Sequence, residues 1–140
     1  INQVQQEVPR IAGAFLEAKA NGADVDVTVL TDQKTSEIGR FAVTESFDDL
    51  GGFKTPTLRN IAATAPYMHD GRHRDLDEVI DFYSDEIRNH PNLHPGLRDQ
   101  NRNVRGYRFS REEKRALEAF LRTLTDDEML RDERFSDPFQ

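Results

Sequence analysis

The 140-residue chain contains no cysteine. This absence excludes disulfide bonds, thiolate metal sites and a cysteine nucleophile, and it excludes attachment of a c-type haem through a C-x-x-C-H motif of this chain. The sequence also has no G-x-S-x-G elbow, no phosphate-binding P-loop and no H-E-x-x-H zinc motif. The chain therefore shows no obvious catalytic set of its own.

Positive charge and long apolar runs are scarce as well. The formal net charge is -7 and the basic residues form no stripe, which argues against a nucleic-acid partner and permits a basic protein partner. No apolar run approaches the roughly 18 residues that a membrane-spanning helix needs. The length suits one domain with a modest core. Because the chain starts at Ile1 and not at Met, we expect a processed N-terminus or a part of a longer chain.

Three segments carry helix signals. The segment 9–22 places Pro9 where a first helical turn accepts proline and Gly22 where a helix commonly ends. In the segment 75–89, Asp75 and Glu78 predict a capping box. A third helix is predicted to start at Ser110, with Glu113 completing a second capping box. Its expected buried face consists of Ala116, Leu117, Phe120, Leu121 and Leu124.

The remaining segments read as extended pieces and loops. Alternating polarity predicts short extended pieces at 24–30 and 40–44, with a polar loop between them. The segment 44–74 is predicted to be a long irregular loop, and such loops are usually functional. We expect the charged tail to wrap the surface, pinned by Leu130, Phe135 and Phe139. The predicted class is mostly α, with long ordered loops and short extended segments.

The four histidines form two pairs with i, i+4 spacing, which on a helix could bind a metal. The first pair is His69 and His73, and the second is His90 and His94. Glycine and proline interrupt both pairs, so neither lies on a predicted helix. We expect loop histidines at His90 and His94, and a hydrogen-bonded, orienting His69. A small-metal site at His69 and His73 is kept as an alternative.

Tyr83 and Met68 each have a structural explanation from the pattern alone. Tyr83 falls on the predicted apolar face of the second helix, where a core tyrosine would give its hydroxyl a backbone partner. Met68 reads as a packing residue beside Tyr67. Three basic residues flank the central loop and suit either ordinary surface charge or neutralisation of a buried acid or a propionate: Lys54, Arg59 and Arg72.

Several blocks occur in an order that resembles a known family. They are "GRFAVT", "FKTPTLRNIAATAPYMHDG", "DLDEVIDFY", "NHPNLHP" and "REEKRALEAFLRTLTD". Over about residues 37–126 the chain resembles the C-terminal haem domain of the bacterial di-haem cytochrome c peroxidase and MauG family. The resemblance implies a cytochrome-c-like helical fold, in an enzyme with two c-type haems and a calcium ion between its two domains.

The resemblance assigns roles to five residues. In that family the distal ligand of the C-terminal haem follows "HDG", as Met in peroxidases and as Tyr in MauG-like members, and the matching position is Tyr83. This implication replaces the core interpretation of Tyr83, and it also means that Met68 is not the ligand. Backbone carbonyls before "HDG", here those of Thr64 and Pro66, would bind Ca2+. His69 and Lys54 would contact haem or order the loop.

The chain departs from the family because the C-x-x-C-H motif and the N-terminal haem domain are missing. The haem c would then be attached to a companion chain or to a missing segment of the same polypeptide. The resemblance implies a periplasmic, MauG-like oxidoreductase that uses peroxide for one-electron oxidation of a redox partner protein or small molecule. A haem-free structural or interaction subunit of a larger cytochrome complex is the alternative.

The expected organisation has three parts. An unassigned N-terminal helix and linker occupy 1–36, the haem-domain portion occupies 37–126, and a surface tail occupies 127–140.

Overall fold

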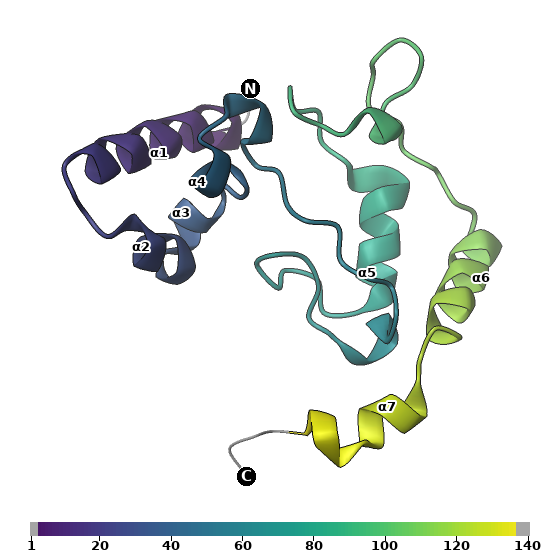
Figure 1. The fold of residues 1–140 in the computed structure, drawn as a ribbon. Helices are drawn as coiled ribbons and strands as arrows, with labels where there is room; N and C mark the ends of the chain where they lie inside the picture. Colours follow the sequence, from purple (N-terminus) through teal and green to yellow (C-terminus); the bar gives the residue numbers. More distant parts are fainter. Residues whose placement is uncertain (1–2, 137–140) are drawn as a thin grey trace. The chain divides into compact units, whose positions relative to one another are not determined.

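The structure, a computed structural model, describes residues 3–136, and these are mostly helical (Figure 1). Within that range the backbone forms no strand, only isolated bridges such as the one between Tyr67 and His73. The mostly α class with long ordered loops is therefore confirmed, and it is compatible with a cytochrome-c-like fold. The α-helices are α1 (Gln3–Ala20), α2 (Val25–Thr31), α3 (Gln33–Ser36), α4 (Phe41–Thr44), α5 (Leu76–Asp81), α6 (Arg111–Arg122) and α7 (Asp127–Arg131).

Short turns of other helix types join these elements. A π-helical turn spans Phe82–Glu86. The 3-10 turns are Phe47–Asp49, Ile61–Ala63, Pro95–Leu97 and Glu133–Phe135. None of the described helices combines the length and the apolar character needed to cross a membrane.

The chain divides into two compact units that interleave along the sequence. The first unit comprises the chain up to Thr55 together with Arg88–Val104. The second comprises Pro56–Ile87 and the chain from Arg105 onward. Each unit contains its own cluster of buried apolar side chains.

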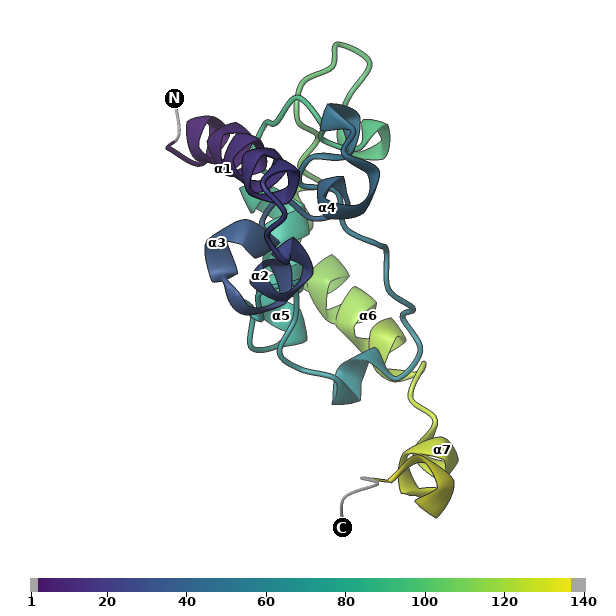
Figure 2. The ribbon, with the colours of Figure 1, turned by 60° about the vertical axis from the view of Figure 1, so that its left-hand side comes forward.

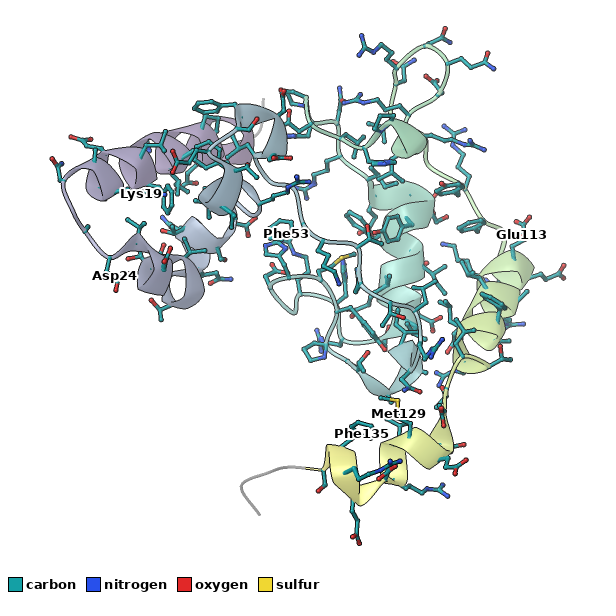
Figure 3. All side chains as sticks on the ribbon, viewed as in Figure 1. Lys19, Asp24, Phe53, Glu113, Met129 and Phe135 are labelled. Atoms are coloured by element: carbon teal, nitrogen blue, oxygen red, sulfur yellow. The ribbon has the colours of Figure 1, made fainter. Side chains whose placement is uncertain are left out.

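In the first unit, α1 packs against the short helices that follow it (Figures 1 and 2). Its core side chains are Val8, Ala12, Phe15, Val25, Ile38, Phe41 and Leu50. As predicted, α1 ends at a glycine: the N–H of Ala23 donates to the Ala18 carbonyl and that of Gly22 to the Lys19 carbonyl, both at 3.0 Å. Gly22 takes a positive φ of 81°, so this is a Schellman motif. Figure 3 marks Lys19 and Asp24 on the two sides of this turn.

The predicted start of α1 is wrong, because Pro9 lies inside the helix and not in its first turn. The helix begins at Gln3, and the residues before Pro9 are rich in Gln and Glu, which favour helix. A proline removes one N–H from the ladder, and the rest of the 18-residue helix continues around it.

The extended segments predicted at 24–30 and 40–44 are also wrong, since α2 and α4 occupy them. Val25 and Val29 fit a two-residue alternation, but they are also four residues apart and both pack into the core of the first unit. The polar segment between them contains a further turn, α3. Asp32 caps it by accepting the N–H of Thr35 at 2.7 Å.

In the second unit, α5 and α6 pack side by side around Leu76, Ile80 and Leu121 (Figure 1). The helix starts predicted from capping residues are confirmed. The Asp75 carboxylate accepts the N–H of Glu78 at 2.9 Å, although the Glu78 carboxylate reaches the N–H of the preceding residue, Arg74, at 2.8 Å. Ser110 and Glu113 form a complete capping box at the start of α6.

Two parts of the predicted packing of the second unit are wrong. Ala116 and Phe120 are exposed, because they lie together at one edge of the α6 face, while Leu117 and Leu121 face the core. The tail is not pinned by its apolar residues: Leu130 and Phe135 are exposed, and Phe139 lies outside the described residues. The tail instead forms α7 and a 3-10 turn, where Figure 3 marks Met129 and Phe135.

Candidate functional site

Tyr83 lies in the π-helical turn that continues α5. Turns of this kind are rare and often occur at functional sites. The Tyr83 residue is 37% exposed, and its ring meets Phe82 edge-on with 5.2 Å between the ring centroids. Among the described residues, no side chain or backbone group forms a hydrogen bond with the Tyr83 hydroxyl. The phenol is thus open to an external group.

This position differs from the one that the helical pattern predicted. Tyr83 was expected on the same buried face as Leu76 and Ile80, and its hydroxyl was expected to find a backbone partner. Instead Ser84, the next residue, is completely buried. A π-helical turn has i→i+5 bonding and is wider than an α-helical turn, so Ser84 comes to lie beside the core and Tyr83 lies outside it. The interpretation of Tyr83 as a satisfied core tyrosine is wrong.

The segment 105–109 lies against this turn and bonds its backbone. The N–H of Tyr107 donates to the Tyr83 carbonyl at 3.4 Å, and that of Arg108 donates to the Ser84 carbonyl at 3.0 Å. The N–H of Phe109 donates to the Ser84 hydroxyl oxygen at 3.0 Å. The Tyr83 and Ser84 carbonyls thus accept hydrogen bonds from this segment. In a continuing α-helix, they would accept from N–H groups of the helix itself.

Gly106 allows the two backbones to approach this closely. A Cβ at Gly106 would lie 2.7 Å from the Ser84 carbonyl oxygen, which is shorter than a van der Waals contact allows. Lys114 of α6 adds ionic links to the same end of α5, because its ammonium lies 2.6 Å from Asp81 and 3.3 Å from Asp85. The hydrogen bond to Asp81 raises the pKa of Lys114. No motif or spacing in the sequence singles out Ser84, Gly106 or Lys114.

The other two tyrosines differ from Tyr83. Tyr67 is a satisfied core tyrosine, since its hydroxyl donates to the Ile61 carbonyl at 2.7 Å and burial raises its pKa. Tyr107 is exposed, but its ring stacks on Phe109 with 5.4 Å between centroids. The Arg105 guanidinium covers that ring at 5.4 Å.

The loop that carries Thr64 and Pro66 remains irregular, as predicted. The Thr64 hydroxyl donates to the Ile61 carbonyl at 3.2 Å, and the peptide bond between Ala65 and Pro66 is cis. In the described part of the chain, no backbone N–H donates to the Thr64 or Pro66 carbonyl. These two oxygens therefore keep lone pairs that suit a hard cation.

The residues after Pro66 form a closed loop. The Tyr67 N–H donates to the His73 carbonyl at 2.7 Å, and the His73 N–H donates to the Tyr67 carbonyl at 3.4 Å. His69 is exposed in this loop. Beside it, a hydrogen bond from the Arg72 side chain lowers the pKa of Asp70. Lys54 belongs to the first unit and is exposed.

His73 has a property that the sequence analysis did not predict. Its Nε2 atom is buried and has no hydrogen-bond partner among the described residues. Its Nδ1 atom lies 3.8 Å from a Glu78 carboxylate oxygen, and its ring lies 5.6 Å from that of Phe82. A buried unsatisfied nitrogen is uncommon in folded proteins and is a candidate for a special role.

The other two histidines are loop residues, as predicted. His90 Nδ1 accepts the N–H of Asn92 at 3.1 Å, and His94 Nδ1 accepts that of Gly96 at 3.0 Å. Hollows of about 370 and 380 Å³ occur in the first unit. None of the five predicted site residues lines either hollow.

Known proteins with similar sequences include bacterial peroxidases. Cytochrome-c peroxidase IdrP2 of Denitromonas iodatirespirans is 37% identical over 93 residues, which are 66% of this chain and 22% of that protein. Cytochrome c551 peroxidase of Nitrosomonas europaea is 35% identical over 95 residues, 68% of this chain and 23% of its own length. The methylamine utilization protein MauG of Methylorubrum extorquens is 38% identical over 72 residues, 51% of this chain and 18% of MauG.

The chain thus spans less than a quarter of the length of these curated relatives. No family model matches the sequence. No solved structure matches it either. The similarities to peroxidases and to MauG confirm that the chain carries a segment resembling the bacterial di-haem cytochrome c peroxidase and MauG family.

Proposed function

We propose that the chain is part of a di-haem peroxidase-like or MauG-like oxidoreductase and that Tyr83 supplies the distal ligand to a haem c. One observation carries this proposal: Tyr83 is exposed on a π-helical turn, and its hydroxyl forms no hydrogen bond with the residues that the structure describes. A buried tyrosine with a satisfied hydroxyl, such as Tyr67, could not serve in this way without breaking its bond to Ile61.

The donor atom suits the chemistry. When bound, the haem would supply peroxide-driven one-electron oxidation, and a hard phenolate oxygen favours the oxidised iron more than a thioether does. The role of Tyr83 is to present this oxygen. The segment 105–109 and Lys114 fix the turn that carries it.

The haem itself must be attached elsewhere, because this chain has no cysteine. A companion chain or a further segment of a longer polypeptide would carry the C-x-x-C-H motifs. The relatives support this part of the proposal, since each is more than four times as long as the region it shares with the chain. A periplasmic location follows from haem c attachment, and a redox partner protein and peroxide complete the proposed system.

A calcium ion is the second proposed cofactor. The carbonyl oxygens of Thr64 and Pro66 accept no backbone hydrogen bond within the described residues, and Ca2+ prefers such oxygen ligands. Two carbonyls are fewer than the six to eight ligands that Ca2+ usually takes, so further ligands would come from water and from the companion segment. His69 and Lys54 are proposed to contact haem or to order the loop. Both are exposed and can reach an external group.

A haem-free structural subunit is the alternative function. It is favoured by the missing cysteines. A small-metal site at His69 and His73 is a further candidate. The Nε2 of His73 supports it, since this buried atom has no hydrogen-bond partner within residues 3–136, but the two histidines do not share a helix.

The optical spectrum of the protein purified with its haem-bearing partner segment separates these functions. Tyr83→Phe should shift the Soret band and abolish a phenolate-to-iron charge-transfer band. Tyr107→Phe is the matched control, because Tyr107 is also exposed but its ring is stacked on Phe109, and it should leave the spectrum unchanged. Identical spectra for the parent and Tyr83→Phe would refute Tyr83 as a ligand. A preparation without any Soret band would favour the structural subunit.

A further inference from the structure

The π-helical turn is held by a part of the chain that is distant in sequence. Three successive N–H groups, from Tyr107 to Phe109, bond the Tyr83 and Ser84 backbone and the Ser84 hydroxyl. The two backbones can approach this closely because Gly106 has no Cβ. The conformation that exposes Tyr83 is thus set from outside its own helix.

We infer that the segment 105–109 is a positioning brace for Tyr83, and that Gly106 is the residue that allows its close approach to Ser84. The brace keeps the turn π-helical, so that buried Ser84 lies beside the core and the phenol stays outside. Without the brace, the Ser84 and Tyr83 carbonyls lose these partners, and α-helical bonding would turn Tyr83 toward the face of Leu76 and Ile80. This inference rests on the proposed ligand role of Tyr83, and it names the residues that make the role possible.

The geometry accounts for the residue types at both contact points. Any side chain at Gly106 would place its Cβ 2.7 Å from the Ser84 carbonyl oxygen, a backbone atom that cannot rotate away. The Ser84 hydroxyl oxygen is a buried acceptor for the Phe109 N–H, and a buried N–H that loses its acceptor is destabilising. Gly106→Ala therefore disrupts the brace through a steric clash, and Ser84→Ala disrupts it through the loss of a hydrogen bond.

The haem-free test uses fluorine NMR of the chain labelled with 3-fluorotyrosine. Three signals are expected, and Tyr83→Phe and Tyr107→Phe assign them. Gly106→Ala and Ser84→Ala should each shift the Tyr83 signal and leave that of Tyr67 in place. Hydrogen exchange at the Arg108 and Phe109 amides should accelerate on the order of tenfold, as expected for loss of a single hydrogen bond.

Two control variants separate positioning from general destabilisation. Gly13→Ala adds a Cβ that meets no atom within 4 Å, so it should move no signal. Leu121→Val weakens the core of the second unit without touching the brace, so it should lower stability and leave the Tyr83 signal in place. A Tyr83 signal unmoved in Gly106→Ala, or moved equally in Leu121→Val, would overturn the inference. If Gly106→Ala does not fold, Ser84→Ala decides by the same criteria.

The haem-bearing preparation distinguishes this inference from the proposed function. If Tyr83→Phe changes the haem spectrum but Gly106→Ala does not, the ligand role stands and the brace is refuted. If Gly106→Ala moves the fluorine signal while Tyr83→Phe leaves the haem spectrum unchanged, the brace holds Tyr83 for some other purpose and the ligand role fails.

Discussion

Asn60 joins the loop of the candidate site to the tail, and its replacement tests how the second unit is held together. The residue is 7% exposed and takes a positive φ of 61°. Its N–H donates to the Leu124 carbonyl at 2.9 Å, and its side-chain oxygen accepts the N–H of Asp126 at 2.6 Å. Its amide nitrogen also lies 3.5 Å from the Met129 sulfur. The backbone conformation and the side chain of Asn60 thus contribute separately to the stability of the second unit.

Two substitutions divide these contributions. Asn60→Gly removes the acceptor for the Asp126 N–H but keeps the positive φ accessible, so the free energy of unfolding should fall by about 1–2 kcal/mol. Asn60→Ala loses the same hydrogen bond and also the short amide side chain that lets asparagine adopt the left-handed region, so relative to Gly it costs about 1 kcal/mol more. The expected loss for Asn60→Ala is therefore about 2–3 kcal/mol.

Urea unfolding at fixed pH measures both losses, and hydrogen exchange in α7 shows where they act. Arg102 is the matched control, because it also has a positive φ, 64°, but is exposed. Arg102→Ala should be less stable than Arg102→Gly, and neither variant should accelerate hydrogen exchange in α7. Equal stabilities for Asn60→Ala and Asn60→Gly would contradict the conformational argument. A fully stable Asn60→Gly would contradict the hydrogen-bond argument.

Two further predictions concern the same unit. His73→Phe should raise the free energy of unfolding by about 1 kcal/mol, because it removes a buried nitrogen that has no partner among the described residues and keeps an aromatic ring in place. His94→Phe, which deletes an acceptor in use, should not raise it. A destabilised His73→Phe would refute this reasoning. The hydrogen bond from Ser84, with help from Lys114, lowers the pKa of Asp85, so its stabilising effect is present above the ordinary aspartate pKa and is lost as pH falls through the lowered one. In urea titrations, Asp85→Asn should therefore be less stable than the parent at pH 7, and the difference should shrink in acid; a difference independent of pH would refute the linkage.

The sequence predicted those features that depend on neighbouring residues. Helix ends were predicted correctly where capping residues mark them, because a cap involves only a few consecutive residues. These are the starts at Ser110 and Asp75 and the end at Gly22. The helices α2 and α4 were missed because they have seven and four residues, which is too short for a helical period to differ clearly from an alternation.

The exposed position of Phe120 has a different cause. Its spacing from Leu117 and Leu121 fits the apolar face of α6, but the core of the second unit is narrow and is filled by Leu121 with Leu76 and Ile80. A small core leaves the edge of an amphipathic face in solvent. Periodicity gives the direction of a helix face, whereas the width of the buried part depends on the partner elements.

Tyr83 shows how far a local pattern and a resemblance can each lead. The pattern alone predicted a buried, satisfied tyrosine, and that description fits Tyr67 and not Tyr83. Periodicity assumes α-helical geometry throughout the segment, but the turn at Tyr83 is π-helical because backbone groups from 105–109 bond to it. Nothing in the sequence of 75–89 predicts the contact with the segment 105–109. The resemblance singled out the same residue for a ligand role without describing the turn, and the proposed role depends on the exposed position of Tyr83.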